Sequence, residues 1–301
     1  MRQFVCKNII FDETIDEVMK QQSTIIGIGE ILWDLLPTGK KAGGAPVNFA
    51  FHAAAAGAES YAISAIGFDP DGDQMIRELQ HNGIQHLIER VPFPTGRVQV
   101  ELKNGIPSYT ISEGVAWDHI PLTEEMKKLA ARCDALCFGT LAQRSETSRN
   151  TIRTLLSLTP PDAFRILDIN IRQPYFSREI VHSSLQLCNI CKTNDEELQL
   201  IKSLFSKEGE DDDSMCAWLM KQYSLQLMIL TAGERESIVY STEGTSLIET
   251  PQVEVADTVG AGDAFTGTLI TSLLEGKKVP QAHNDAVQRA AFVCTREGAW
   301  V

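Results

Sequence analysis

The stretch DTVGAGDAFTG, from Asp257 to Gly267, predicts more about this chain than any other. Three small residues, Gly260, Ala261 and Gly262, precede Asp263, and apolar residues then follow at helical spacing. The small residues therefore lie at the N-terminus of a predicted helix, where free backbone N–H groups and the helix dipole attract an anion. The loop contains no lysine, so we expect an anion hole made of backbone groups.

Asp263 has two interpretations. An acid in the first turn of a helix is often only a cap, which stabilises the helix by about 1 kcal/mol. Capping does not require surrounding glycines, whereas close approach of the backbone to a ligand does. The alternative places Asp263 beside a transferred phosphoryl group, where it accepts a proton from an attacking hydroxyl while the N–H groups stabilise negative charge. We expect Asp263 to be a catalytic base.

The bulk composition restricts the class of protein. The chain has 301 residues, is 43% hydrophobic and carries a formal net charge of −13. That charge argues against a nucleic-acid partner, which needs a basic face. No apolar run is long enough to span a membrane, so we expect no membrane partner. Residues 1–22 lack the pattern of a signal peptide, and the seven cysteines suit a reducing compartment, so we expect a cytoplasmic protein.

From Ser23 onward, short β-branched runs alternate with segments of helical periodicity. This alternation predicts right-handed crossovers and a largely parallel sheet covered by helices on both faces. We expect strands within 24–36, 61–67, 135–139, 164–170, 185–191 and 225–231. We expect helices near 46–57, 69–83, 122–132, 146–156, 195–204, 214–222, 262–275 and 282–295.

Residues 96–111 (GRVQVELKNGIPSYTI) interrupt the alternation. Two β runs flank Asn104 and Gly105, which is a strong hairpin signal. A hairpin inserted into an α/β chain is typical of an edge addition or a lid. We expect an N-terminal extension over residues 1–22 and a single domain over 23–301, with β-lid segments near 31–45 and 91–118.

With these motifs in order, the chain resembles the PfkB, or ribokinase-like, family of carbohydrate kinases. The resemblance runs from about Thr24 to the end of the chain. It rests on AGGAPVNFA at 42–50, KTNDEE at 192–197, LTAG at 230–233 and DTVGAGDAF at 257–265. It implies a three-layer α/β/α sandwich with a mainly parallel central sheet and a small β lid.

The resemblance also implies roles for individual residues. Asp263 would be the catalytic base, and Gly260, Ala261 and Gly262 the anion hole. The sugar site would be lined by Asp34, Gly43, Gly44 and Asn48, where the glycines admit a polar ring and the amide can both donate and accept. The same four positions are also a turn and a helix start, which is the structural alternative.

ATP and Mg²⁺ are the implied cofactors. Asn194, Thr231 and Gly233 would contact ATP, and Glu197 would organise Mg²⁺ through water, which suits an ion that keeps much of its hydration. The alternative for Asn194 and Glu197 is a solvated first helical turn. Asp257 would mark a monovalent-cation site of the kind that binds K⁺. The final ligand position of that site would fall beyond Val301, which leaves K⁺ activation open.

The choice of sugar rests on three segments that resemble bacterial fructokinases: EGVAWDHI at 113–120, FGTLAQR at 138–144 and LDINIRQPYF at 167–176. They imply phosphorylation of D-fructose to fructose 6-phosphate. Arg172 would hold phosphate or sugar oxygens with its forked donors, or else form a surface ion pair. The alternatives are a kinase for 2-keto-3-deoxygluconate or ribose, and a catalytically silent sugar-binding regulator. The family also suggests a homodimer formed through the lid.

Two features set limits to these interpretations. Glu236 stands where the family has the last glycine of a Thr-x-Gly-x-x-Gly turn, so that turn is expected to be altered. The GIGE sequence at 27–30 suggests a dinucleotide-binding oxidoreductase, but the third glycine of that fingerprint would fall on Leu32. The dinucleotide interpretation is therefore rejected.

Overall fold

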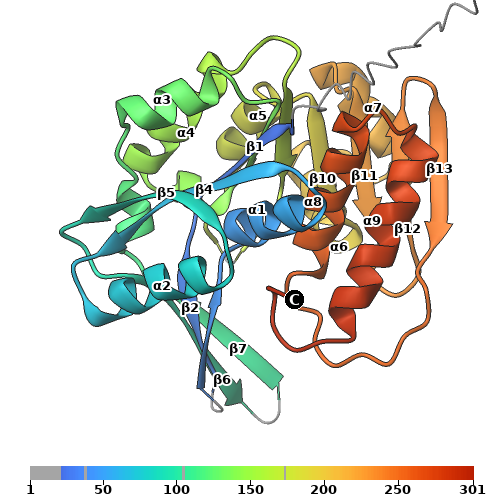
Figure 1. Ribbon diagram of the computed structural model, residues 1–301. Helices are drawn as coiled ribbons and strands as arrows, with labels where there is room; N and C mark the ends of the chain where they lie inside the picture. The colour runs from blue at the N-terminus through green and yellow to red at the C-terminus, as the bar shows by residue number, and fades with distance from the viewer. Residues whose placement is uncertain (1–21, 37–38, 104–105, 173) are drawn as a thin grey trace, which may run out of the picture.

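The computed structural model describes residues 22–36, 39–103, 106–172 and 174–301. Within these residues the chain forms a nine-stranded sheet, in the order β13-β12-β11-β10-β9-β8-β1-β4-β5, and a separate four-stranded sheet (Figure 1). The parallel strands of the large sheet are β1 (Thr24–Ile28), β4 (Glu59–Gly67), β5 (Gln85–Val91), β8 (Ala135–Gly139), β9 (Phe164–Asp168), β10 (Ile190–Asn194) and β11 (Leu227–Thr231). At one end of the sheet, β12 (Glu236–Ser241) and the edge strand β13 (Gly244–Glu249) are antiparallel.

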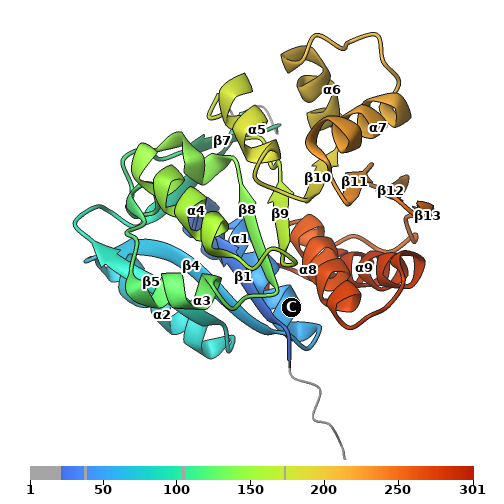
Figure 2. The same ribbon diagram turned by 90° about the horizontal axis from the view of Figure 1, so that it is seen from above.

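Helices cover both faces of the large sheet (Figure 2). One face packs against α1 (Ala45–Ala55), α2 (Pro70–His81), α8 (Ala261–Leu274) and α9 (Val279–Cys294). The other packs against α3 (Glu124–Ala130), α4 (Glu146–Leu158), α5 (Arg178–Leu185), α6 (Asp195–Leu204) and α7 (Asp212–Tyr223). Buried side chains such as Phe265 on the first face and Leu155 on the second each contribute about 1.5–3 kcal/mol by leaving water. The predicted three-layer sandwich with a mainly parallel sheet is confirmed.

The smaller sheet projects away from the main body (Figure 1). Its strands run in the order β3-β2-β6-β7, with β2 at Leu32–Leu36, β3 at Gly39–Gly43, β6 at Gly96–Lys103 and β7 at Ile106–Ile111. Asp71 of α2 anchors it: its carboxylate accepts from Lys40 and Arg97, and its carbonyl oxygen accepts from Trp33 Nε1 at 3.1 Å. The predicted turn at Asn104–Gly105 lies outside the described residues.

Several elements differ from the expectation. The apolar run 24–36 is two strands in different sheets, because the chain turns at Gly29, whose φ of 154° suits glycine. The strand expected at 185–191 begins only at Ile190, since α5 continues through Leu185. The sequence analysis missed α5, β5, β12 and β13. The predicted extension, apart from residue 22, lies outside the described residues. None of the described helices is both long and apolar enough to cross a membrane.

Candidate active site

Asp263 lies in the first turn of α8, next to the first turn of α1. Asn48 of α1 donates a hydrogen bond from Nδ2 to Asp263 Oδ2 at 2.8 Å, although the two residues are 215 positions apart. Asp263 also lines a small cavity at the carboxyl ends of three strands. The other residues that line it include Glu30 after β1, Gly139 at the end of β8 and Asp168 at the end of β9. Ligands of open α/β sheets bind at this carboxyl edge. The structure therefore brings the predicted base and the predicted sugar ligand together.

The surroundings of Asp263 hold its carboxyl group near the midpoint of its titration at neutral pH. Burial, followed by the negative charge of Asp168, raises the pKa of Asp263 to about 7. The hydrogen bond from Asn48 and the positive charges of Lys192 and Arg172 oppose that rise. A carboxylate with a pKa near the working pH can accept a proton and release it again, which is what a general base needs.

Gly260, Ala261 and Gly262, the predicted anion hole, lie at the start of α8, and a lysine lies beside them. Gly260 has a left-handed φ of 80°, and the helix begins at Ala261. The ammonium of Lys192, on β10, lies 3.4 Å from the point where a β-carbon on Gly262 would be placed. The loop itself lacks a lysine, yet the folded site has a cation that a neighbouring strand supplies.

Lys192 is held in a buried ion pair. Its Nζ lies 3.0 Å from Asp168 Oδ2 and 3.1 Å from Oδ1. Burial favours the neutral amine, but the charges of Asp168 and Glu197 outweigh it and raise the pKa of Lys192, so the group is an ammonium. The sequence analysis missed Lys192 and Asp168 as site residues. The available signal was a lysine and an aspartate at the ends of apolar strands, inside two of the quoted motifs.

The predicted sugar residues gather where the small sheet meets α1. Asp34 on β2 and Gly43 on β3 are close, because a β-carbon on Gly43 would lie 3.0 Å from Asp34 Oδ2. Gly44 has a φ of 126°, and a β-carbon there would lie 2.3 Å from the carbonyl oxygen of Glu30. Burial raises the pKa of Asp34 to about 6, partly offset by the charge of Arg172. Both glycines thus allow a tight junction beneath Asp34.

Arg172 is exposed in the loop after β9, and its positive charge reaches Asp263, Asp34 and Glu197. The loop is anchored by Glu197, whose Oε1 accepts from the Ile171 amide at 2.9 Å. Oε2 of Glu197 accepts from the Asn194 amide at 3.0 Å, and Asn194 Oδ1 accepts in return from the Glu197 amide at 2.7 Å. Glu197 therefore positions the backbone beside Arg172 and caps α6.

These contacts bear on the expected magnesium site. Glu197 is only 5% exposed, and both its oxygens accept backbone hydrogen bonds. In the part of the chain that the structure describes, no group of three or more His, Cys, Asp or Glu side chains could hold a metal ion. With both Glu197 oxygens already bonded to the backbone, the surroundings of Glu197 fit a Mg²⁺ ion that would be held mainly by phosphate oxygens and water, which are the ligands this ion prefers. The water-mediated role of Glu197 stays a prediction.

Two of the predicted ATP residues are neighbours at the carboxyl ends of adjacent strands. Asn194 on β10 is directly opposite Thr231 on β11 in the register of the two strands. Gly233 follows in a turn with a left-handed φ of 57°. The turn closes through the Glu236 carbonyl, which accepts from the Ala232 amide at 2.8 Å. A glutamate at position 236 is therefore compatible with a closed turn here.

Asp257 lies in front of the glycine loop and joins three parts of the chain. Its carboxylate accepts from the Val259 amide at 3.0 Å and the Gly298 amide at 3.1 Å. Lys41 of β3 lies 3.4 Å from Oδ2, so the small sheet is bridged to the loop before α8. Burial alone would raise the pKa of Asp257. The two amide donors and the charge of Lys41 outweigh this effect, so the pKa of Asp257 is lowered. The monovalent-cation role of Asp257 stays a prediction.

Glu30 is a further acid that the sequence analysis missed. It is 3% exposed, directly after β1, and it lines a cavity of about 10 Å³ together with Asp168 and Asp263. Burial raises the pKa of Glu30 to about 7, and the negative charge of Asp263 adds to the rise. Glu30 was part of the GIGE stretch, which was considered only as a dinucleotide fingerprint.

The chain is similar to carbohydrate kinases along most of its length. The model of the pfkB family carbohydrate kinases matches residues 7–300. A fructokinase of Escherichia coli is 28% identical over 260 residues, covering 82% of this chain and 83% of its own. A fructokinase of Rhizobium leguminosarum bv. trifolii is 28% identical over 265 residues, with 83% and 79% covered. An ATP-dependent 6-phosphofructokinase of Thermoanaerobacterium thermosaccharolyticum is 26% identical over 288 residues, with 89% and 84% covered.

Solved structures show the same fold. The crystal structure of an uncharacterised sugar kinase of Pyrococcus horikoshii superimposes with a TM-score of 0.79 at 25% identity, covering 92% of this chain and 94% of its own. The fructokinase of Vibrio cholerae O395 bound to fructose, ADP and calcium gives a TM-score of 0.79 at 20% identity, with 93% and 95% covered.

Proposed function

Because the chain belongs to the PfkB family of carbohydrate kinases, we propose that it transfers the γ-phosphoryl group of ATP to D-fructose. The products are fructose 6-phosphate and ADP. The observation that carries the proposal is the position of Asp263. Its carboxylate accepts a hydrogen bond from Asn48, a proposed sugar ligand, and the residue comes directly after Gly260–Gly262, the proposed anion hole. Base and anion hole are thus on one helical turn.

The proposed reaction uses these groups in one step. The acceptor hydroxyl gives its proton to the Asp263 carboxylate while its oxygen bonds to the γ-phosphorus, and the bond to the bridging oxygen breaks to release ADP. The N–H groups at Gly260–Gly262 and the Lys192 ammonium stabilise the charge on the transferred group. A positioned general base contributes about 10²–10⁴-fold to such a rate.

The nucleotide is proposed to lie along the carboxyl ends of β10 and β11. Asn194 and Thr231 would contact its phosphates and Gly233 the adjoining ribose. Bound Mg²⁺ would neutralise charge on the β- and γ-phosphates. The adenine would lie against the last helix, where Phe292 is 41% exposed and is flanked by the guanidinium groups of Arg289 and Arg296.

The charge of the sugar pocket supports a neutral acceptor. Glu30, Asp34 and Asp263 belong to the proposed pocket, and the ionised forms of these acids would repel a dianionic sugar phosphate. Arg97 of the small sheet is not free to bind a phosphate, because its Nε is paired with Asp71 Oδ2 at 2.8 Å. Carboxylates and amides suit the hydroxyl groups of a free sugar.

A second candidate acceptor is 2-keto-3-deoxygluconate. The exposed Arg172 faces the same pocket and has the forked geometry that binds a carboxylate. Arg172→Gln separates the two candidates: loss of a carboxylate clamp would raise the KM of the sugar acid strongly and that of fructose little.

The small sheet is proposed to act as a lid over this pocket. It carries Asp34 and Gly43, and Lys41 on the same sheet reaches Asp257. Lid closure would exclude water from the reacting phosphate. A homodimer through the lid is also proposed, and sedimentation velocity of the purified chain measures it directly.

The test is a phosphorylation screen with ATP and Mg²⁺ over fructose, ribose, 2-keto-3-deoxygluconate and fructose 6-phosphate. ADP release is followed, and the product is identified by phosphorus NMR. The highest kcat/KM is expected with fructose. Preference for fructose 6-phosphate would overturn the choice of acceptor, and sugar binding without turnover would identify a silent regulator.

A further inference from the structure

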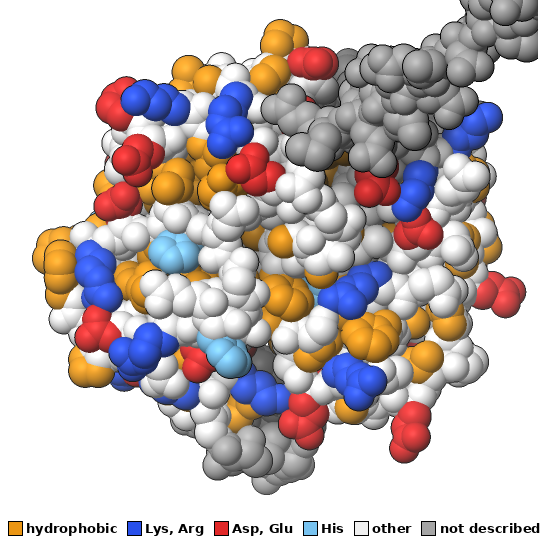
Figure 3. Space-filling view, viewed as in Figure 1, with side chains coloured by type: hydrophobic (Ala, Val, Ile, Leu, Met, Phe, Trp, Pro, Cys, Tyr) orange, Lys and Arg blue, Asp and Glu red, His pale blue; other side chains and the backbone are white. Residues whose placement is uncertain are grey.

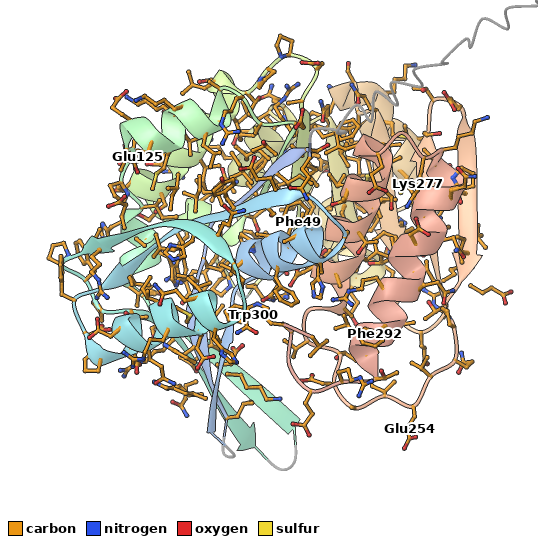
Figure 4. The ribbon with its side chains drawn as sticks, viewed as in Figure 1. Phe49, Glu125, Glu254, Lys277, Phe292 and Trp300 are labelled. Carbon is orange, nitrogen blue, oxygen red and sulfur yellow. The ribbon has the colours of Figure 1, made fainter. Side chains whose placement is uncertain are left out.

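The C-terminal segment, residues 298–301, packs against the catalytic loop and α1 (Figure 4). The Gly298 amide donates to Asp257, and Ala299 lies so close to Gly260 that a β-carbon on Gly260 would be 2.7 Å from the Ala299 methyl group. Trp300 follows and reaches Asn48: its indole Nε1 donates to Asn48 Oδ1 at 2.8 Å. A chain of two hydrogen bonds thus runs from Trp300 through Asn48 to Asp263.

The chemistry of these groups determines which way the Asn48 amide faces. An indole N–H is only a donor, so the atom opposite it has to be the amide oxygen. The amide nitrogen then faces Asp263, to which it donates at 2.8 Å. With the amide turned by 180°, its oxygen would oppose the Asp263 carboxylate and its NH₂ group would oppose the indole N–H. Both contacts would be repulsive.

The segment is held on both sides of Trp300. Arg289 lies beside His52 Nδ1, with Nη2 at 3.2 Å, and also donates to the Val301 carbonyl oxygen. Because a guanidinium only donates, Nδ1 of His52 accepts, and Nε2–H donates to the Ala299 carbonyl oxygen at 2.9 Å. His52 and Arg289 therefore fix the backbone that carries Trp300.

We propose that Trp300 is a positioning residue for phosphoryl transfer: its indole N–H orients the Asn48 amide, whose N–H favours the ionised form of the Asp263 carboxyl group and directs it at the acceptor hydroxyl. The inference rests on the proposed role of Asp263 as the base. Trp300 does not touch the reacting atoms and acts only through Asn48.

Other charged groups also face Asp263. These are Glu30 after β1, Asp168 on β9, Arg172 in the following loop and Lys192 on β10. Trp300→Phe leaves these side chains in place, and Glu30, whose pKa is also about 7, titrates together with Asp263 in both proteins. A difference in titration between the variant and the parent therefore reports on the Asn48 amide. The half-titrated state of Asp263 near neutral pH makes this change measurable.

The experiment compares Trp300→Phe with the parent on the acceptor that the substrate screen identifies. Phenylalanine keeps an aromatic ring and removes the N–H donor. We expect kcat to fall about three- to tenfold, as for the loss of one neutral hydrogen bond, with KM for ATP unchanged. The acid limb of kcat/KM against pH should move to higher pH, because a flipped amide disfavours the ionised carboxylate.

Trp218→Phe is the matched control. Trp218 lies on α7, on the opposite face of the large sheet, so the same chemical change there should leave kcat and the acid limb unaltered. Thermal unfolding of both variants establishes that each is folded. An unchanged acid limb and kcat in folded Trp300→Phe would overturn the positioning role.

A second readout does not require turnover. The side-chain amide signals of Asn48 in ¹⁵N–¹H spectra, assigned by their loss in Asn48→Ser, should titrate with Asp263 in the parent. In Trp300→Phe the midpoint should move to higher pH. If the parent phosphorylates no acceptor, the proposed function fails, and this titration still decides the role of Trp300: an identical midpoint in both proteins would refute it.

Discussion

The ammonium of Lys192 lies 3.0 Å from Asp168 and 3.4 Å from the position that a β-carbon on Gly262 would occupy. A strand residue thus supplies the cation that is missing from the glycine loop. A β-carbon at position 262 would be in van der Waals contact with that ammonium and would occupy the space beside it. The absence of a side chain there and the presence of a lysine on β10 are therefore parts of one arrangement for binding negative charge.

Lys192→Met should lower kcat by about 10²-fold or more, because it removes a donor from the site of developing charge. It should also destabilise the fold by about 3–5 kcal/mol, since Asp168 would be left as an unpaired buried charge. Initial rates at saturating substrate and urea unfolding measure the two effects.

The double variant Lys192→Met/Asp168→Asn separates catalysis from folding. Removing both charges should restore most of the lost stability, yet kcat should stay low. Recovery of activity together with stability would show that Lys192 serves only the fold.

Asp263→Asn should reduce kcat by about 10²–10⁴-fold while leaving the affinities for ATP and sugar largely intact. Isothermal titration and initial rates check this. Asp162→Asn, at an exposed position before β9, is the control for the same change in charge. Comparable kcat in Asp263→Asn and the parent would remove Asp263 as the base.

The same variant should be more stable than the parent at pH 8. The folded-state pKa of Asp263 is about 7, above its unfolded value, so its contribution to stability is present at low pH and is lost as pH rises toward 7. Asparagine remains neutral throughout. The difference in Tm should therefore be largest at pH 8 and small at pH 4, and a variant that is less stable at pH 8 would contradict the assignment.

Gly260→Ala should destabilise the protein more than Gly276→Ala. Both glycines have left-handed φ angles, 80° and 86°, so both substitutions carry the strain of about 1–2 kcal/mol for an L-residue. Only at Gly260 does the new methyl group also meet Ala299, at 2.7 Å, whereas Gly276 has no heavy atom within 4 Å of that point. Urea unfolding gives the loss of unfolding free energy in each variant, and the difference between the two losses is the cost of the clash with Ala299. Equal losses in the two variants would refute this prediction.

His283 should make stability depend on pH below neutrality. It is buried between Ser237 and Ser246, at 2.8 Å and 2.9 Å, and burial lowers its pKa to about 4. The unfolded chain takes up a proton near pH 6.5 but the folded chain does not, so stability falls from pH 6.5 toward pH 4 at about 1.4 kcal/mol per pH unit. Urea unfolding should show a shallower slope in His283→Gln than in the parent; an unchanged slope would contradict this prediction.

The parts of the site that were predicted are those that the local sequence determines. Gly260–Gly262 and Asp263 share one helical start, and Gly44 and Asn48 share another, so their motifs define the geometry within a few residues. Lys192 and Trp300 were missed because their partners, Gly262 and Asn48, lie 70 and 252 positions away, and no periodicity reports such contacts.

The fold shows the same division. The buried parallel strands are continuous apolar runs and were predicted. In contrast, β12 mixes buried with partly buried residues and β13 is mostly exposed, over six positions each. The break between β1 and β2 was hidden because apolar residues continue on both sides of Gly29. The exposed face in Figure 3, where acidic, basic and apolar side chains are interspersed, offers no comparable pattern for locating the site.

The bridge between Lys41 and Asp257 has a consequence for how fast the pocket exchanges its contents. It joins the small sheet to the body through a lysine that is 38% exposed, and added salt weakens an ion pair that is exposed to solvent. The ion pair of Lys192 and Asp168 is shielded from solvent and responds far less. Higher ionic strength should therefore speed dissociation of bound sugar and leave the rate of phosphoryl transfer itself nearly constant.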